Sequence, residues 1–288
     1  MKISRKINWV SSLKENKELV ILEEALQKFY STNTSYFSDI DFTSENWINK
    51  NEFGYISIVK QALASSSVCE IGCGNANILK HYPQLASKYC GMDFSESILK
   101  ANVEKYPLAN FHKFEKPNEF PIPNEKFDLV FSVFVIEHVT RPAAFLDECK
   151  RILKPGGMLI ILCPDFLGQG RMTSQRAGFG MGTSKAKLKK GNFLDALVTL
   201  YDNRIRIPKV CRNYEVQVSA KPLFLINLCP VVFEDSFDPD VDAVYVTSKH
   251  EICSYLKHDF VEIYNSDELK NYETKKKIIF LQMVNNQQ

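Results

Sequence analysis

The chain has 288 residues with 36 Lys and Arg against 34 Asp and Glu, so its net charge is only +2. Nearly half of the chain, 45%, is apolar, which is typical of a globular protein with a buried core. A charge this small implies no general attraction to nucleic acid, and we expect no nucleic-acid partner.

Eight cysteines are scattered along the chain without a Cys-x-x-Cys pair. This spacing argues against a zinc site, and thiols in apolar runs are typical of a reducing compartment. The first residues lead into no apolar signal core, and no apolar run approaches the length of a bilayer span. We therefore expect a cytoplasmic protein without a transmembrane segment.

Residues 12–30 place apolar side chains near helical spacing and predict an amphipathic helix. We expect this helix to pack on the edge of a sheet. A polar and aromatic segment follows it as far as residue 51.

The stretch Val68–Asn77 organises the rest of the chain. It predicts a strand over 68–71, a Gly-x-Gly turn at Gly72 and Gly74, and a helix over 78–82 that ends before Pro83. Glycine permits positive φ and lets a ligand lie against the backbone, while the helix that follows presents unpaired N–H groups. This pattern is typical of a site for a nucleotide-like cofactor at the carboxyl end of a parallel strand.

A second short strand, Cys90–Asp93, ends in an acid about twenty residues further on. A carboxylate at this position can accept hydrogen bonds from both hydroxyls of a ribose. A dinucleotide fingerprint would have glycine where this chain has Asn77, which argues against NAD.

Further strands are predicted at 110–114, 127–134 and 158–163. The run 127–134 is nearly all apolar, which favours a strand buried on both faces. Pro142 begins a helix that buries Phe145 and Leu146, and 154–157 predicts a tight turn.

Four motifs resemble those of class I S-adenosylmethionine (SAM) dependent methyltransferases of type 11. They are Glu70-Ile-Gly-Cys-Gly-Asn, Gly91-Met-Asp-Phe-Ser-Glu-Ser-Ile-Leu, Phe120-Pro-Ile-Pro-Asn-Glu-Lys-Phe-Asp-Leu-Val with Ile136-Glu-His-Val, and Arg151-Ile-Leu-Lys-Pro-Gly-Gly-Met-Leu-Ile-Ile. The resemblance covers roughly residues 60–165 and, more faintly, the C-terminal end.

The resemblance implies an α/β fold with a Rossmann-like seven-stranded sheet, six strands parallel and one antiparallel. The sixth strand is then expected at 260–264 after a helix at 250–256, and the seventh at 277–283. The chain divides into an N-terminal helical or lid segment (1–60), a SAM-binding core (61–164), a helical cap insertion over the site (165–245) and the C-terminal return of the core sheet (246–288).

The resemblance also implies SAM as cofactor and assigns its binding residues. They are Glu70, Gly72, Cys73, Gly74, Asp93, Phe94, Ser132 and Val133. In related enzymes an acidic residue binds the adenine amino group, and the corresponding position in this chain is Lys116. Either Glu115 takes this role through a shifted loop, or a backbone carbonyl replaces the acid. Tyr36 and Phe37 are read either as lid residues over the cofactor or as anchors of a surface loop.

His138, just beyond the fourth strand, is the candidate general base for an oxygen or nitrogen acceptor. The alternative is that Glu137 and His138 cap a helix and hold the loop. Metal-dependent relatives carry a Glu where this chain has Phe134, which argues against a metal site, and we expect none.

The insertion is strongly basic, since residues 171–221 carry eleven Lys or Arg against three acids. This asymmetry favours an anionic substrate, with Arg171, Arg176, Tyr201 and Tyr245 as candidate contacts. The alternative is a solvated face, or one paired with the acidic run that begins at Glu234.

We therefore predict methyl transfer to a small-molecule or glycan-linked acceptor, as O-methylation in sugar or cell-surface polysaccharide metabolism. One alternative is a quinone-like or lipid acceptor, with the partly apolar insertion in peripheral contact with a membrane. Another is a SAM-binding module without turnover. The oligomeric state is left open.

Overall fold

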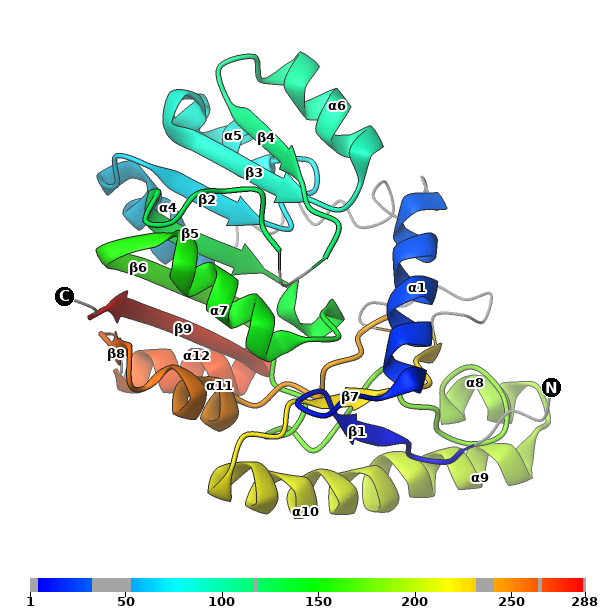
Figure 1. The fold of residues 1–288 in the computed structure, drawn as a ribbon. Coiled ribbons are helices and arrows are strands. Elements are labelled where there is room, and N and C mark those ends of the chain that lie inside the picture. Colours follow the sequence, from blue (N-terminus) through cyan, green and yellow to red (C-terminus); the bar gives the residue numbers. More distant parts are fainter. Residues whose placement is uncertain (1–4, 33–52, 117–118, 232–240, 264–265, 287–288) are drawn as a thin grey trace.

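The computed structural model describes residues 5–32, 53–116, 119–231, 241–263 and 266–286. Its centre is a seven-stranded sheet with the order β4-β3-β2-β5-β6-β9-β8 (Figure 1). The strands are β2 (Val68–Ile71), β3 (Tyr89–Asp93), β4 (Asn110–Lys113), β5 (Phe127–Val133), β6 (Leu153–Pro164), β8 (Phe260–Glu262) and β9 (Ile278–Asn285).

Strand β9 runs antiparallel to both of its neighbours, and the other pairings in this sheet are parallel. The predicted α/β sheet with six parallel strands and one antiparallel strand is therefore confirmed. The predicted turn at 154–157 lies instead inside β6, where it interrupts the pairing with β5 between Phe127 and Leu129.

Alternating side chains of the strands enter two apolar layers, one on each face of the sheet. Leu159 and Ile161 pack with α7 (Pro142–Ile152) and α11 (Lys249–Leu256). Ile160 and Leu162 pack on the other face with α4 (Phe53–Ala64), α5 (Asn77–His81), α6 (Glu96–Lys105) and α12 (Asp267–Lys276). A strand covered on both faces is apolar at most of its positions, which explains the nearly continuous runs in the sequence.

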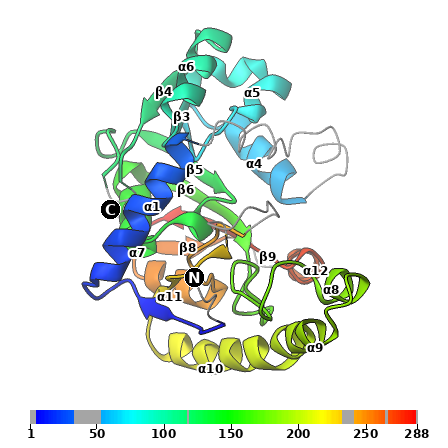
Figure 2. The ribbon, with the colours of Figure 1, turned by 90° about the vertical axis from the view of Figure 1, so that its right-hand side faces the viewer.

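The amphipathic helix α1 (Lys17–Thr32) lies in a different place from the one we expected. It crosses the side of the sheet where the strands have their carboxyl ends, rather than packing along a sheet edge (Figures 1 and 2). Glu23 on this helix accepts hydrogen bonds from Thr140 and Arg141, and this ties α1 to the loop after β5. Tyr36 and Phe37 lie outside the described residues.

The insertion, residues 165–245, forms α8 (Ser184–Lys189), α9 (Phe193–Tyr201), the π-helical turn η3 (Asp202–Arg206), α10 (Ile207–Ala220) and β7 (Leu225–Asn227). Strand β7 pairs with β1 (Trp9–Ser11) from the N-terminal segment. Both contribute to a third apolar cluster that includes Trp9, Ile207 and Leu225.

The helices of the insertion do not lie over the glycine turn as a cap would. Figures 1 and 2 place α8, α9 and α10 at the bottom of the molecule, whereas β2 and β3 lie in its upper half. The predicted boundary at residue 60 falls inside α4, which packs with the core. Because β1 and α4 join different apolar clusters, the N-terminal segment is shared between the insertion and the core.

Candidate functional site

The glycine turn after β2 is held by the next strand. The backbone N–H groups of Gly72 and Cys73 both donate to the carbonyl of Met92, at 2.8 and 3.0 Å. Gly72 and Gly74 have φ of +70° and +46°, which favour glycine. A Cβ at Gly72 would lie 2.3 Å from Cγ2 of Val135, whereas a Cβ at Gly74 would have no heavy atom within 4 Å. The turn is therefore packed against the β5 loop on one side and open on the other.

Asp93 is the hub of this turn. Its carboxylate accepts the N–H of Gly74 at 2.9 Å and that of Ser95 at 3.0 Å, and the residue is only 7% exposed. Burial raises the pKa of this carboxyl, while its hydrogen bonds to backbone N–H groups oppose the rise. A carboxylate has about four lone-pair sites, so the hydrogen bonds from Gly74, Ser95 and Phe94 leave room for a further donor. Asn102 of α6 donates to the carbonyl of Gly74 at 2.7 Å and thereby links the turn to α6.

Glu70 and Cys73 lie on either side of Ile71 and Gly72 and differ in their exposure. Glu70 is half-buried and accepts a hydrogen bond from the hydroxyl of Tyr89, while desolvation raises the pKa of its carboxyl to about 8. The Cys73 thiol is buried, which raises its pKa well above the ordinary value. Cys73 thus contributes its backbone to the turn and its side chain to the interior.

Phe94 and Glu115 lie beyond the carboxyl ends of β3 and β4. The half-buried ring of Phe94 lies 4.2 Å from that of Phe114, centroid to centroid. Glu115 is exposed, with its carboxylate 2.8 Å from Nζ of Lys113. Lys113 is the register partner of Asp93, so Glu115 follows at the same edge of the sheet. Its role toward adenine stays a prediction.

Ser132 and Val133 end β5, next to β2. Ser132 is the register partner of Ile71 and is buried, and Val133 is half-buried. The structure thus brings the residues predicted for the cofactor to the carboxyl ends of adjacent strands. Strand β2 lies between β3 and β5, where the strand order reverses, and open α/β sheets bind ligands at such a switch point.

His138 lies in the 3₁₀ turn η2 (Ile136–His138) and meets two residues from distant segments. Its Nδ1 is 3.3 Å from Oδ2 of Asp242, and the hydroxyl of Tyr30 donates to the same oxygen at 2.8 Å. Its Nε2 lies 3.8 Å from Oε1 of Glu137. The His138 side chain is 18% exposed, whereas those of Asp242 and Glu137 are almost fully buried.

This arrangement suits proton transfer. A carboxylate beside Nδ1 favours the tautomer that carries its proton there, which leaves the lone pair on Nε2 as the acceptor. An imidazolium formed on that transfer would be stabilised by the carboxylates of Asp242 and Glu137. The carbonyl of Glu137 also accepts the N–H groups of Val244 and Tyr245, at 2.7 and 2.9 Å, so the end of the insertion is bonded to η2.

Sequence reasoning missed Tyr30 and Asp242. Tyr30 falls near the end of an ordinary amphipathic helix, and Asp242 is the last residue of an acidic run with nothing to distinguish it from the other acids. Each lies more than one hundred residues from His138 in sequence, so only the fold brings the three together.

The four candidate substrate residues do not form one cluster of exposed side chains. Tyr245 is fully buried and its hydroxyl donates to Glu251 at 2.7 Å, so the structure makes it part of the core and we withdraw it as a substrate contact. Arg176 is 6% exposed, and burial lowers the pKa of its guanidinium. Arg171 and Tyr201 are exposed, Tyr201 on α9.

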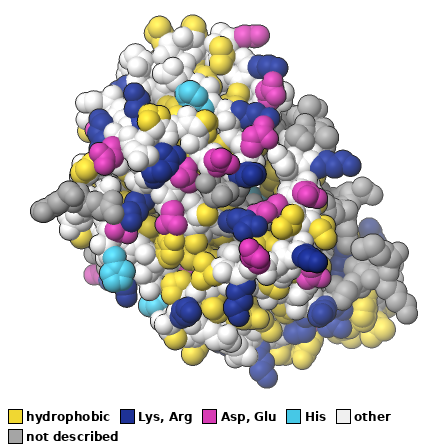
Figure 3. Space-filling view, in the orientation of Figure 1, with side chains coloured by type: hydrophobic (Ala, Val, Ile, Leu, Met, Phe, Trp, Pro, Cys, Tyr) yellow, Lys and Arg dark blue, Asp and Glu magenta, His cyan; other side chains and the backbone are white. Residues whose placement is uncertain are grey.

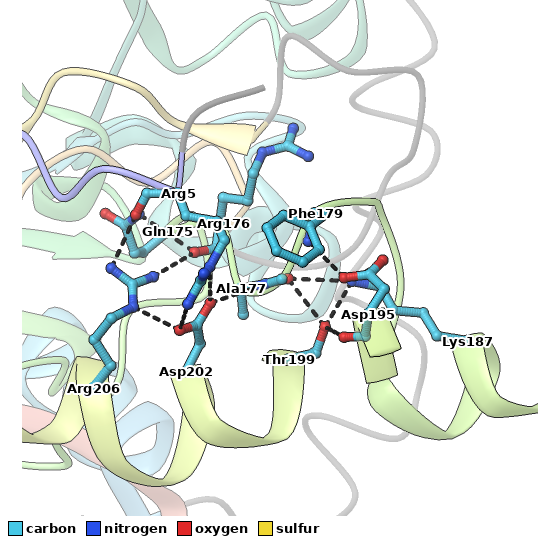
Figure 4. Close-up of polar contacts among 11 residues, drawn as sticks. Arg5, Gln175, Arg176, Ala177, Phe179, Lys187, Asp195, Thr199, Asp202 and Arg206 are labelled. Atoms are coloured by element: carbon cyan, nitrogen blue, oxygen red, sulfur yellow. Dashed lines mark hydrogen bonds and ion pairs between the residues drawn. The ribbon is translucent and has the colours of Figure 1, made fainter. Parts of the chain in front are cut away.

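Only some of the basic residues of the insertion form ion pairs with its own acidic residues. Lys187 pairs with Asp195 at 3.1 Å, and Arg206 pairs with Asp202 at 2.6 Å (Figure 4). Eight of the eleven basic residues in 171–221 are exposed: Arg171, Lys185, Lys189, Lys190, Arg204, Lys209, Arg212 and Lys221. Most of the acidic run from Glu234 lies outside the described residues.

Residues 69–161 match the family model of a methyltransferase domain. The chain is 29% identical over 119 residues to a probable S-adenosylmethionine-dependent methyltransferase of Mycolicibacterium smegmatis, covering 41% of this chain and 46% of the relative. It is 32% identical over 102 residues to a ubiquinone biosynthesis O-methyltransferase of a Bradyrhizobium species, and this match covers 34% of this chain and 40% of the relative. The chain therefore spans less than half the length of these curated relatives.

A solved structure from Pyrococcus horikoshii has the same fold over most of the chain. It covers 90% of this chain and 99% of its own, with a TM-score of 0.51 and 14% identity. At this identity the likeness concerns the fold alone. None of the helices in the described part of the chain has the length and hydropathy needed to cross a bilayer.

Proposed function

We propose that the chain, whose residues 69–161 match a methyltransferase domain, is a class I SAM-dependent methyltransferase that transfers the methyl group of SAM to a hydroxyl oxygen of a small-molecule or glycan-linked acceptor. The observation that carries this proposal is the open glycine turn beside the buried carboxylate of Asp93, at the point where the strand order reverses. Sugar or cell-surface polysaccharide metabolism is the setting that the basic insertion favours.

The residues at this point fit SAM. The open side of Gly74 lets a ligand approach the backbone, and Asp93 retains acceptor capacity for a ribose hydroxyl. Glu70 offers a second carboxyl near the carboxyl end of the adjacent strand β2, one that can ionise beside a cation. Bound SAM supplies a methyl group on a sulfonium that is already a good leaving group, so the protein mainly positions the acceptor and excludes water.

The acceptor must lose a proton when its oxygen gains the methyl group. We assign that proton to Nε2 of His138, with Asp242 beside Nδ1 holding the ring and Tyr30 holding Asp242. The link to the cofactor turn is short, because Val135, three residues before His138, packs against Gly72. His138 is therefore the proposed catalytic residue, and Tyr30 and Asp242 are positioning residues.

Calorimetric titration of SAM and of S-adenosylhomocysteine tests the cofactor assignment. Asp93→Ala should weaken both by about 1–3 kcal/mol, since charge-assisted hydrogen bonds to ribose are left unmade. Asp147→Ala on α7 removes an exposed carboxyl that accepts a hydrogen bond from the Tyr255 hydroxyl, and should bind as wild type. If folded wild-type protein binds neither ligand, the proposal fails.

Methyl transfer from labelled SAM to extracted metabolites tests the base. His138→Ala should keep its SAM affinity and lose about 100-fold or more in rate, whereas the exposed His258→Ala should keep both. The rate of Asp242→Asn should lie between the rates of these two variants. The pH dependence of its rate should also shift, which a purely structural role of Asp242 would not cause. Tight SAM binding with no methylated product in any extract would instead favour the non-catalytic binding module.

A quinone-like or lipid acceptor is the second candidate, and two observations favour it. Helix α9 exposes large apolar side chains, and relatives that match at 30–32% identity are named as ubiquinone biosynthesis O-methyltransferases. Methylation of a lipid extract but not of a water-soluble extract would select this acceptor over the glycan-linked one.

We place this activity in the cytoplasm. The support is the state of the cysteines: all eight are free and six are buried. Free thiols of this kind persist in a reducing compartment.

A further inference from the structure

Helix α9 turns its large apolar side chains outward. Phe193 is 67% exposed, Leu194 71% and Leu197 64%, and Tyr201 and Ile205 continue the series at 51% and 53%. After the adjacent pair Phe193 and Leu194, separations of three to four residues put Leu197, Tyr201 and Ile205 on the same side of the helix and of the π-helical turn that extends it. A contiguous exposed stripe of this size is uncommon on a soluble surface and marks an interaction site.

The inner side of the same helix is small and polar. Ala196, Thr199 and Asp202 are almost fully buried, and Figure 4 shows the polar contacts of Thr199 and Asp202. Nζ of Lys187 donates to Oγ1 of Thr199 at 2.7 Å, and Asp202 accepts the N–H of Gly178 at 2.8 Å. The outward direction of the apolar stripe is therefore fixed by buried hydrogen bonds on the other side.

Asp202 binds several groups on the inner side of the helix. Its carboxylate accepts Nε of Arg5 at 2.8 Å and Nε of Arg206 at 2.6 Å, and these guanidinium groups hold its pKa well below the ordinary value. Asp195 likewise accepts the N–H groups of Phe179 and Gly180. Asp195 is also paired with Lys187, and Asp202 with Arg5 and Arg206, so the negative charge of both carboxylates is offset by cations of the chain.

Basic side chains border the apolar stripe. Lys185, Lys189 and Lys190 on and after α8 are exposed, and so is Arg204 in η3. Phe179 and Leu188 add exposed apolar area beside them, at 51% and 47%. We call the exposed side chains of residues 179–205 the α9 face. In Figure 3, hydrophobic and basic side chains lie together at the lower right, where Figure 1 places α8 and α9.

We propose that the α9 face docks on the surface of a membrane that contains anionic phospholipids. An interfacial helix needs apolar and aromatic side chains to enter the boundary between headgroups and acyl chains, and cations beside them to meet anionic headgroups. The α9 face has both, and the segment 171–221 has three acids, two of which are Asp195 and Asp202. A second copy of the chain is a poorer occupant, because it would bring two basic surfaces together.

The docking surface goes beyond methyl transfer and does not depend on it. Vesicle binding is measured without SAM or acceptor, so its failure would leave the cofactor assignment untouched. Conversely, a chain that binds vesicles but not SAM would retain this inference and lose the proposed activity.

Co-sedimentation with vesicles tests the proposal. Wild-type protein should bind vesicles of phosphatidylcholine with phosphatidylglycerol more tightly than vesicles of phosphatidylcholine alone. The double variant Leu194→Glu, Leu197→Glu should lose about tenfold or more in binding, because two apolar anchors become anions. The matched control is Val103→Glu, Leu108→Glu, which changes residues that are 52% and 72% exposed near β4 and should bind as wild type.

The basic border is tested separately with Lys189→Glu, Lys190→Glu, which should weaken binding to anionic vesicles and reduce its dependence on salt. A circular dichroism spectrum and a cooperative thermal unfolding transition like those of wild type show that each variant is folded. Absence of vesicle binding by wild type, or equal binding by the α9 and control variants, overturns the proposal. Self-association of wild type that is abolished by Leu194→Glu, Leu197→Glu, without vesicle binding, would make the face an interface between copies and also overturn it.

Discussion

Helices α7 and α9 both have an apolar stripe, and the two stripes have opposite directions. In α7, Phe145 and Leu146 are 0% exposed and pack against the sheet. In α9, Phe193 and Leu194 are 67% and 71% exposed. The same pair of residue types, Phe followed by Leu, therefore lies in the core in one helix and on the surface in the other.

The difference shows that periodicity defines a stripe but not the direction in which it points. The direction depends on what the opposite side of the helix can contact. The sheet offers α7 an apolar layer, which favours burial of Phe145. The segment before α8 offers α9 backbone N–H and carbonyl groups, which bond Asp195, Thr199 and Asp202. Outward-facing leucines are then the consequence of satisfied polar groups inside.

The largest effect is expected from truncation of the α7 stripe. Phe145→Ala should lower the free energy of unfolding by about 3–5 kcal/mol, because a fully buried ring is replaced by a cavity. Urea denaturation with a fluorescence or circular dichroism readout measures it. A loss below about 1 kcal/mol would mean that the α7 stripe is no better buried than that of α9.

A smaller loss is expected when the inner anchor of α9 is removed. Asp202→Ala should cost about 1–3 kcal/mol, since Arg5, Arg206 and the N–H of Gly178 lose their acceptor. The exposed Glu215→Ala on α10 is the control and should stay within about 0.5 kcal/mol of wild type. If the two variants have equal stability, the polar side of α9 is not what orients it.

The contacts of Asp202 also predict that the stability of the protein depends on pH in the acidic range. The pKa of Asp202 is held below its ordinary value of 3.8, so its stabilising contribution is complete above that pH and is lost as the pH falls through the folded-state pKa. Wild-type stability should therefore decline below about pH 4, and Asp202→Asn should decline less. Thermal unfolding at a series of pH values would show parallel curves for the two proteins if this contribution were absent.

The smallest effect is expected from the outer side of α9. Phe193→Ala makes the same chemical change as Phe145→Ala, but should alter the free energy of unfolding by no more than about 0.5 kcal/mol. The aromatic ring is 67% exposed and leaves no cavity. A loss of stability comparable to that of Phe145→Ala would show that Phe193 is covered in solution. Repeating the urea titration at several protein concentrations would then distinguish coverage by a second copy of the chain, which depends on concentration, from coverage within one chain.

The core of the fold was accessible from the sequence because its signals are local. Continuous apolar runs identified β5 and β6, and the glycines at 72 and 74 identified the turn. The predicted strands are present in the structure to within a few residues, and Asp93 lies beside that turn as a hydrogen-bond acceptor. Each of these features depends on residues that are neighbours in the chain or on the regular geometry of parallel strands.

The errors concern contacts between distant segments. Tyr245 was expected at a substrate and lies in the core, because Glu251 provides a buried acceptor for its hydroxyl. Helix α1 was expected at a sheet edge and lies across the carboxyl ends of the strands, where Glu23 meets Arg141. Neither partner could be identified from the helical or strand pattern around the residue concerned.

The sequence by itself determined individual strands, the glycine turn and the position of Asp93, since strand periodicity and glycine backbone freedom are properties of short stretches. The assembly of these strands into a seven-stranded α/β sheet was implied by the resemblance to methyltransferases. Only the tertiary structure decided that Tyr30 and Asp242 meet His138, and that the leucines of α9 point outward. These features depend on which polar groups find buried partners, and a chain satisfies its polar groups across the whole fold rather than within one segment.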